Sequence, residues 1–333
     1  MTLTQLRYIV SIADSGLNIT LAAERIHATQ PGVSKQLKQL EGELGFQLFT
    51  RKGKSLHAVT PAGQQVIARA RAILEEARSI RALAANLRGD DRGELTILTT
   101  HTQARFVLPP AVGAFKQRYP MVGFHLRPHG DAQVMSLFAG GQADLAIISS
   151  SGPAPLGGLS VPLYSWSRAV VVPRSHPLAT LGRPLRLGDL AGQPLVSYDS
   201  SLRPESSLRQ AFVNAGMTPR FACTSSDADL IKTYVRAGLG VGILAEMAVL
   251  PEDTRDLKVL DASHLLPPCT TWLVLRRDRV LRSYTLSLAE QLAPHLDRRD
   301  IQAALAGDAT PEWPTPPNWN ELKSQFTTPS MVA

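Results

Sequence analysis

The chain has 333 residues, of which 44% are hydrophobic and 19% are charged. This composition excludes an intrinsically disordered chain, and the length suits two or three domains. Two cysteines, Cys223 and Cys269, are too few for a disulfide framework, and no apolar run approaches the roughly 18 residues that a membrane helix needs. Charged residues also interrupt the first apolar stretch, so we expect no signal peptide and a soluble, cytoplasmic protein.

The positive charge is concentrated at the amino-terminal end. The whole chain carries a net charge of +7, and residues 1–90 hold twelve Lys and Arg against seven Asp and Glu, a net of +5. A basic head on a nearly neutral body indicates a polyanionic partner for the head, although solvated basic faces are also common.

Three short helices are predicted within the first 45 residues. The first covers residues 3–13, and the second follows Asn18 or Thr20 as its cap. Thr29 is the expected cap of the third helix, which has Pro31 in its first turn and ends at Gly45. This third helix is expected to bury one apolar stripe, formed by Val33, Leu37, Leu40 and Leu44. Two helices, a short turn and a third amphipathic helix are typical of a helix-turn-helix.

The other side of the third predicted helix carries amide, hydroxyl and amine groups, which suit the base edges of a major groove. A hairpin over residues 46–59 then presents basic residues around Gly53, where a wing contacts phosphates. We therefore predict a winged helix-turn-helix over residues 1–60, in preference to a plain three-helix bundle with a solvated polar face. The candidate DNA-binding residues are Thr29, Gln30, Pro31, Ser34, Lys35, Lys38, Arg51, Lys52 and Lys54.

A long linker helix is predicted over residues 61–88, with Thr60 as its cap. Its apolar residues alternate at spacings of four and three over three repeats: Val66, Ala70, Ile73, Ala77, Ile80, Ala84 and Leu87. A strict period of 3.5 residues is typical of a coiled-coil seam with a partner helix rather than of a helix packed on its own domain. We expect a dimer that presents two heads to twofold-related DNA half-sites.

Beyond a polar break at residues 88–93, strand-like and helix-like segments alternate, which predicts an α/β fold with parallel strands. One helix is predicted over residues 103–118, interrupted near Pro109 and Pro110. The expected effector-binding domain, residues 93–300, has two lobes around a cleft, as in periplasmic binding proteins. Lobe I is predicted at about 93–163 and 267–300, lobe II at about 164–266, and a proline-rich tail, poorly ordered or docked, at 301–333.

Hydroxyl groups gather where the first strand of this domain ends and its first helix begins, in residues 99–103. Helix-start N–H groups, three hydroxyls and an amide suit a small anion, whereas helix capping by Thr100 or Thr102 alone is the simpler alternative. A solute-binding protein is disfavoured by the basic head. No sequence pattern of a hydrolase, a metal site or a disulfide oxidoreductase is present, so we expect no enzyme, metal or cofactor. The two cysteines indicate packed thiols rather than a redox sensor.

Several motifs together resemble those of LysR-type transcriptional regulators. In the head they are residues 22–24 (Ala-Ala-Glu), 29–34 (Thr-Gln-Pro-Gly-Val-Ser), 40–45 (Leu-Glu-Gly-Glu-Leu-Gly), 48–49 (Leu-Phe) and 60–63 (Thr-Pro-Ala-Gly). Residues 99–105, 227–229 and 231–235 are similar to the branch of the family that contains CysB and Cbl.

This resemblance implies a tetrameric regulator of sulfur-assimilation and cysteine-biosynthesis genes. Its implied partners are double-stranded promoter DNA, RNA polymerase and an effector such as acetylserine, sulfate, thiosulfate, adenosine phosphosulfate or a sulfonate. By motif, Thr100, Thr102 and Gln103 would hold the anion, Ser149 stands where the branch has threonine, and Trp166 would border the cleft. Residues 203–206 (Arg-Pro-Glu-Ser) depart from the branch pattern Thr-Gly-Arg-Ser, and Arg203 is a further candidate effector contact. A different small-anion effector and regulon is therefore the alternative.

Overall fold

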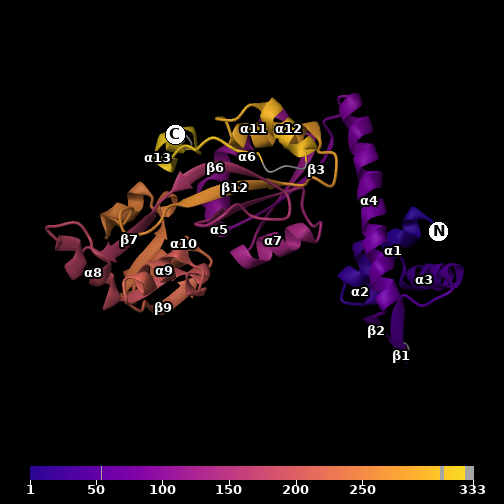
Figure 1. Cartoon of the computed structure of the whole chain (residues 1–333), viewed down its shortest axis with the longest axis horizontal. Helices are drawn as coiled ribbons and strands as arrows, with labels where there is room; N and C mark the ends of the chain where they lie inside the picture. The colour runs from indigo at the N-terminus through magenta and orange to yellow at the C-terminus, as the bar shows by residue number, and fades with distance from the viewer. Residues whose placement is uncertain (54, 308–310, 327–333) are drawn as a thin grey trace. The chain divides into compact units, whose positions relative to one another are not determined.

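The computed structural model describes residues 1–53, 55–307 and 311–326 (Figure 1). The chain divides into two compact units: residues 1–89 with 278–280 form the first, and the other described residues form the second. Within this described part, no helix combines the length and the apolar character needed to cross a membrane. Lys54 and part of the predicted tail lie outside the described residues.

The three predicted helices of the head are confirmed as α1 (Leu3–Asp14), α2 (Ile19–Arg25) and α3 (Gln30–Leu44). Asn18 and Thr29 cap α2 and α3 because their side-chain oxygens accept the backbone N–H groups of Leu21 and Gly32. Gly45 ends α3 in the left-handed conformation, with φ of 77°. The predicted stripe of α3 lies in the head core, fully buried except for the half-buried Leu44.

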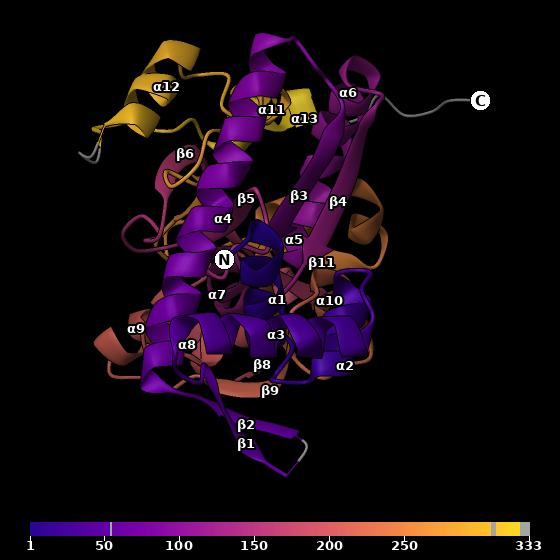
Figure 2. The same cartoon turned by 90° about the vertical axis from the view of Figure 1, so that its right-hand side faces the viewer.

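The wing is an antiparallel hairpin of β1 (Phe49–Lys52) and β2 (Ser55–Val59), followed by α4 (Pro61–Leu87) (Figure 2). Thr60 caps α4 by accepting the N–H of Gly63. A Cβ atom on Gly63 would lie 2.1 Å from the carbonyl oxygen of Leu48, so only glycine allows this helix start to pack against the backbone just before β1. Ile67 and Ala70 extend the core of the head into α4.

The second unit contains two five-stranded sheets, one in each lobe (Figure 1). The sheet of lobe I has the order β4-β3-β5-β12-β6, with β3 parallel to β4 and β5 and with β12 antiparallel to β5 and β6. Its strands are β3 (Gly93–Thr99), β4 (Val122–Pro128), β5 (Leu145–Ser150), β6 (Leu159–Trp166) and β12 (Cys269–Leu275). Its helices are α5 (His101–Phe106), α6 (Leu108–Arg118), α7 (Asp131–Ala139), α11 (Ser283–Leu292), α12 (Arg298–Ala306) and α13 (Trp319–Phe326).

The sheet of lobe II has the order β11-β7-β10-β8-β9, with a parallel core of β10, β8 and β9. Its strands are β7 (Arg168–Pro173), β8 (Pro194–Tyr198), β9 (Arg220–Ser225), β10 (Val241–Ala245) and β11 (Leu257–Asp261). Its α-helices are α8 (Leu187–Ala191), α9 (Ser207–Asn214) and α10 (Ala228–Arg236), and its 3₁₀ turns are Pro177–Thr180, Asp199–Leu202, Glu246–Ala248 and Pro251–Arg255. The mixed α/β fold with two lobes is as predicted.

Three features of the second unit differ from the expected elements. The predicted helix over residues 103–118 breaks at Val107, between α5 and α6, and not at Pro109 and Pro110, because both prolines fit the first turn of α6. Strands β6 and β11 were not predicted. The chain crosses to lobe II only after Trp166, because β6 continues that far in the sheet of lobe I. Strand β6 contains Pro162, which is tolerated because β6 is an edge strand with one neighbour.

The described part of the carboxyl-terminal segment docks on lobe I. The backbone N–H of Ser165 in β6 donates to the carbonyl of Pro317 (2.9 Å), and the indole N–H of Trp313 donates to the carbonyl of Ser160 (2.8 Å). The Trp319 ring lies against Tyr164, with 5.3 Å between the ring centroids. Of the two alternatives for this segment, its described residues show the docked one, and they cover the open edge of β6.

Candidate functional site

A cavity of about 910 Å³ lies in the cleft between the two lobes of the second unit. Its walls include all six side chains predicted to bind an effector: Thr100, Thr102, Gln103, Ser149, Trp166 and Arg203. The first five come from lobe I and Arg203 comes from lobe II. Long-range folding therefore brings together residues that are separated by up to a hundred positions in the chain.

The loop from β3 into α5 contributes Thr100 and Thr102. The Thr100 hydroxyl accepts the N–H of Gln103 at 3.5 Å and therefore caps α5. The capping alternative is thus correct for this one hydroxyl. Thr102 donates to the hydroxyl of Tyr198 in lobe II at 3.1 Å. Because α5 has only six residues, its side chains matter more to the site than its helix dipole.

Gln103 is a buried support within this wall, with 1% of its surface exposed. Its amide nitrogen donates to Ser149 and to Thr271, each at 3.3 Å, and its amide oxygen accepts from the hydroxyl of Tyr164. Burial raises the pKa of Tyr164 well above its usual value, so this hydroxyl keeps its proton and stays a donor. Both polar atoms of the Gln103 side chain are thus held by hydrogen bonds to neighbouring side chains.

A triangle of polar atoms lies beside Gln103, formed by the side chains of Ser149, Thr271 and Trp166. The Ser149 and Thr271 oxygens are 2.9 Å apart, and the Trp166 indole N–H reaches both, at 3.4 and 3.1 Å. The sequence reasoning missed Thr271 and Tyr164. Only the strand register, in which Thr271 lies opposite Ser149 and Tyr164, shows that they belong to the site.

This wall of the cleft presents neutral hydrogen-bond donors. Hydroxyl groups and an indole N–H can solvate a small anion through hydrogen bonds. The guanidinium of Arg168, which also lines the cavity, lies 5.9 Å from the centre of the Trp166 ring. Ser149 and Thr100 are half-buried and line the cavity. The buried Gln103 and Thr271 hold the Ser149 hydroxyl in place through hydrogen bonds.

The remaining walls of the cavity carry charged side chains. The departure at residues 203–206 had pointed to Arg203 and Glu205, whereas the sequence reasoning did not identify Asp131, Arg168 and Asp199. Burial raises the pKa of Asp131, while a hydrogen bond from Ser200 and the charge of Arg203 lower it, and the charge of Asp199 adds to the rise. The cleft therefore presents a neutral wall and a charged wall.

In the head, the described members of the predicted DNA-binding set belong to α3, its cap and the wing. Gln30, Lys35, Lys38 and Lys52 are exposed, Ser34 is half-buried, and Thr29 and Pro31 form the start of α3. Arg51 instead forms an ion pair with the buried Glu41 at 3.1 Å, and Glu41 also accepts the N–H of Leu48. Arg51 therefore holds the wing against α3, which the sequence pattern did not indicate.

The predicted heptad seam of α4 is divided: Val66 and Ala70 pack in the core of the head, whereas the later large apolar residues are exposed. Ile73, Ile80 and Leu87 are 42%, 62% and 81% exposed. Exposed isoleucine and leucine along one seam of a helix are typical of a face that another helix covers.

Both cysteines are free thiols, and burial raises the pKa of Cys269, as expected of a packed residue.

A basic winged helix-turn-helix and a two-lobed domain with a polar cleft define a ligand-responsive DNA-binding protein. Residues 3–64 match the sequence model of the bacterial regulatory helix-turn-helix proteins of the LysR family, and residues 88–297 match that of the LysR substrate binding domain. The chain belongs to the LysR family. It is a DNA-binding transcriptional regulator and not an enzyme.

Particular relatives narrow this assignment. The chain is 41% identical to the HTH-type transcriptional regulator CysB of Haemophilus influenzae, over 91% of this chain and 94% of the relative. It is 38% identical to the HTH-type transcriptional regulator SsuR of Burkholderia cenocepacia, over 92% and 99% of the two chains. It also resembles the crystal structure of the cofactor-binding domain of the Cbl transcriptional regulator, with 33% identity and a TM-score of 0.58 over 65% of this chain and 94% of that domain.

Proposed function

We propose that this regulator controls genes of sulfur assimilation, cysteine biosynthesis or alternative sulfur sources, and that a small anion related to sulfur metabolism, bound in the cleft, controls its action on promoter DNA. The sulfur assignment rests on the similarity to CysB, SsuR and Cbl, and on the branch motifs at residues 99–105 and 227–235. The observation that supports an anionic effector is the neutral wall of the cleft, where the hydroxyl groups of Thr100, Thr102 and Ser149 and the indole of Trp166 line one cavity.

The tetrahedral oxygens of sulfate, thiosulfate or a sulfonate accept several hydrogen bonds at once, which is what clustered hydroxyls supply. Acetylserine and adenosine phosphosulfate are the larger members of the proposed class. The alternative is a different small-anion effector with a different regulon. The charged wall near Arg203 favours it, since a guanidinium there can form an anion contact in addition to those of the neutral wall.

On DNA, α3 would lie in the major groove with Gln30, Ser34 and Lys38 toward base edges, while Lys35, Lys52 and Lys54 reach phosphates. Two chains joined along the seam of α4 would present two heads to one operator, and a pair of such dimers gives the tetramer usual for this family. Effector binding would favour one arrangement of the lobes and so change how dimers pair and bend the DNA.

Calorimetry with the full-length protein tests the effector. Sulfate, thiosulfate, acetylserine, adenosine phosphosulfate and simple sulfonates are titrated in turn into wild type, Thr100→Val and Ser149→Ala. We expect one or more of them to bind wild type, and each variant to weaken that binding about tenfold through one or two lost hydrogen bonds. Thr180→Val, an exposed threonine outside the cavity, is the matched control. No binding by any of the compounds contradicts the proposal.

Footprinting on the promoter next to the regulator's own gene, with and without the bound compound, tests the response on DNA. The expected result is a change in the protected region or in the hypersensitive bands that mark a bend. Identical footprints in both conditions contradict control by the cleft.

A further inference from the structure

Two oppositely charged side chains face the same cavity from different lobes. Asp131 is the first residue of α7 in lobe I, and Arg203 follows the 3₁₀ turn Asp199–Leu202 in lobe II. Neither forms an ion pair with any residue that the structure describes, although the charge of Arg203 acts on the Asp131 carboxyl.

A half-buried carboxylate beside an anion site is unfavourable unless the ligand compensates it. Desolvation disfavours the charged form of Asp131, and a simple dianion on the neutral wall would add repulsion. An ammonium group on the ligand removes both costs, because it pairs with the carboxylate. A carboxylate on the same ligand would form a bidentate contact with Arg203.

The size of the cleft also exceeds what an inorganic anion needs. A volume of about 910 Å³ lies near the upper end of the range for sites that hold metabolite-sized ligands. Such a cavity has room for a ligand larger than an inorganic anion, and its lining includes both the neutral wall and the pair Asp131 and Arg203.

We propose that the effector is an α-amino acid whose side chain ends in a sulfur oxyanion. Its ammonium group contacts Asp131, its carboxylate contacts Arg203, and its sulfonate or sulfate accepts from Thr100, Ser149 and the indole of Trp166. Asp131 and Arg203 are then the residues that select this ligand over simple sulfur anions. The inference rests on the proposed function, that the cleft takes up a small anion related to sulfur metabolism.

Three probes that differ by one group each test this inference by calorimetry with the full-length protein. Cysteate carries a sulfonate, an ammonium and a carboxylate, 3-sulfopropionate lacks the ammonium, and taurine lacks the carboxylate. We expect cysteate to bind wild type at least tenfold more tightly than either of the other two. Asp131→Asn should remove the preference for cysteate over 3-sulfopropionate, and Arg203→Gln the preference for cysteate over taurine. Asp91→Asn, an exposed site outside the cavity, should change neither.

The outcomes separate this inference from the proposed function. If wild type binds cysteate and 3-sulfopropionate equally well, or if Asp131→Asn keeps the full preference, the amino-acid ligand is wrong while a sulfur-anion site still stands. If the three probes, the inorganic sulfur anions, acetylserine and adenosine phosphosulfate all fail to bind, the proposed function itself is contradicted. The comparison of ligands on wild type needs no variant to fold.

Discussion

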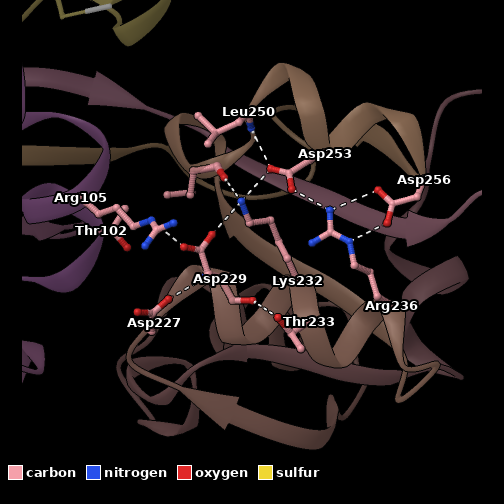
Figure 3. Close-up of polar contacts among 12 residues, drawn as sticks. Thr102, Arg105, Asp227, Asp229, Lys232, Thr233, Arg236, Leu250, Asp253 and Asp256 are labelled. Atoms are coloured by element: carbon pink, nitrogen blue, oxygen red, sulfur yellow. Dashed lines mark hydrogen bonds and ion pairs between the residues drawn. The ribbon is translucent and has the colours of Figure 1, made fainter. Parts of the chain in front are cut away.

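Arg105 forms an ion pair with Asp229 across the two lobes of the second unit, with 2.5 Å between its Nε and a carboxylate oxygen (Figure 3). The other oxygen of Asp229 lies 3.0 Å from the buried Nζ of Lys232. Arg105 lies near the end of α5, and Thr102 in the first turn of the same helix donates to Tyr198 in lobe II. One short helix therefore contacts the opposite lobe at both ends and forms part of the cleft wall.

Replacing Arg105 should separate effector binding from the response on DNA. The Arg105→Gln variant removes a 61% exposed charge, so we expect the free energy of unfolding to change by less than about 1 kcal/mol. Calorimetry should give effector affinity within about threefold of wild type, because the neutral wall is intact. Footprinting should show a reduced effector-dependent change.

Arg127→Gln is the matched control, since Arg127 is exposed on β4 of the same lobe and does not line the cleft. A full effector-dependent change in the footprint of Arg105→Gln is the result that contradicts a coupling role for this ion pair.

Lys232 is the buried centre of an ionic network in lobe II. Its Nζ lies 2.7 Å from Asp253, which also pairs with Arg236, and 2.9 Å from the carbonyl of Ala248. Lys232→Met leaves Asp253 buried with one cation fewer, and we expect it to lower the free energy of unfolding by about 3 kcal/mol in urea titrations. The exposed control Lys258→Met should change it by less than about 0.5 kcal/mol. Equal effects of the two changes contradict this assignment.

The same network gives a dependence of stability on pH. Burial acts to raise the pKa of Asp253, but the hydrogen bonds from Lys232, Arg236 and the N–H of Leu250 outweigh it and hold the pKa below its usual value. The stabilisation is complete above the unfolded pKa of about 3.9 and is lost as the pH falls through the folded value. The difference in free energy of unfolding between wild type and Lys232→Met should therefore shrink below about pH 4. A constant difference from pH 7 to pH 3 contradicts it.

Ionisation of Asp131 should lower the stability of the folded protein, whereas ionisation of Asp253 raises it. Because burial raises its pKa in the folded protein, the ionised carboxylate opposes folding at neutral pH. Asp131→Asn should raise the free energy of unfolding of the ligand-free protein at pH 7, and the gain should vanish below about pH 4, where the carboxyl is protonated in both states. Urea titrations at several pH values measure this. A loss of stability at pH 7 would contradict it.

Trp319 connects the docked carboxyl-terminal segment to the effector site. It is 8% exposed and packs on Tyr164, whose hydroxyl orients Gln103. Trp319→Ala should lower the free energy of unfolding by about 3 kcal/mol or more and weaken effector binding, whereas Trp319→Phe should retain most of both. Urea titrations and calorimetry report the two effects. Unchanged effector affinity in Trp319→Ala shows that the contact serves stability alone.

Lys52 should contribute to DNA affinity through phosphate contact and not through base reading. Lys52→Gln is expected to weaken binding to all duplexes alike and to reduce the slope of log K against log salt by about 0.9 for each head. Filter binding or anisotropy over a range of salt concentrations measures the slope. Lys258→Gln, an equal loss of charge in the second unit, is the control. A change confined to one operator sequence argues for base contact instead.

Local sequence signals predicted the head well. Periodicity, Asn18 and Thr29 as caps, and Gly45 as a helix end depend on residues within four positions of one another, so the helices of the head and α4 followed directly. The hydroxyl cluster at residues 99–103 was visible for the same reason. Strand β6 could not be predicted in this way, because a proline such as Pro162 argues against a strand unless the strand is known to lie at the edge of a sheet.

The sequence by itself determined the class of fold, the basic winged head, the apolar seam of α4 and five of the residues on the neutral wall. Each of these features could be predicted from short-range patterns or motifs. Only the tertiary structure decided that Thr271 and Tyr164 support Gln103, that Asp131 and Arg203 face one cavity, and that Arg105 meets Asp229. These partners are separated by 61 to 168 positions or lie in different lobes. Their meeting depends on strand order and lobe closure, which no local pattern encodes.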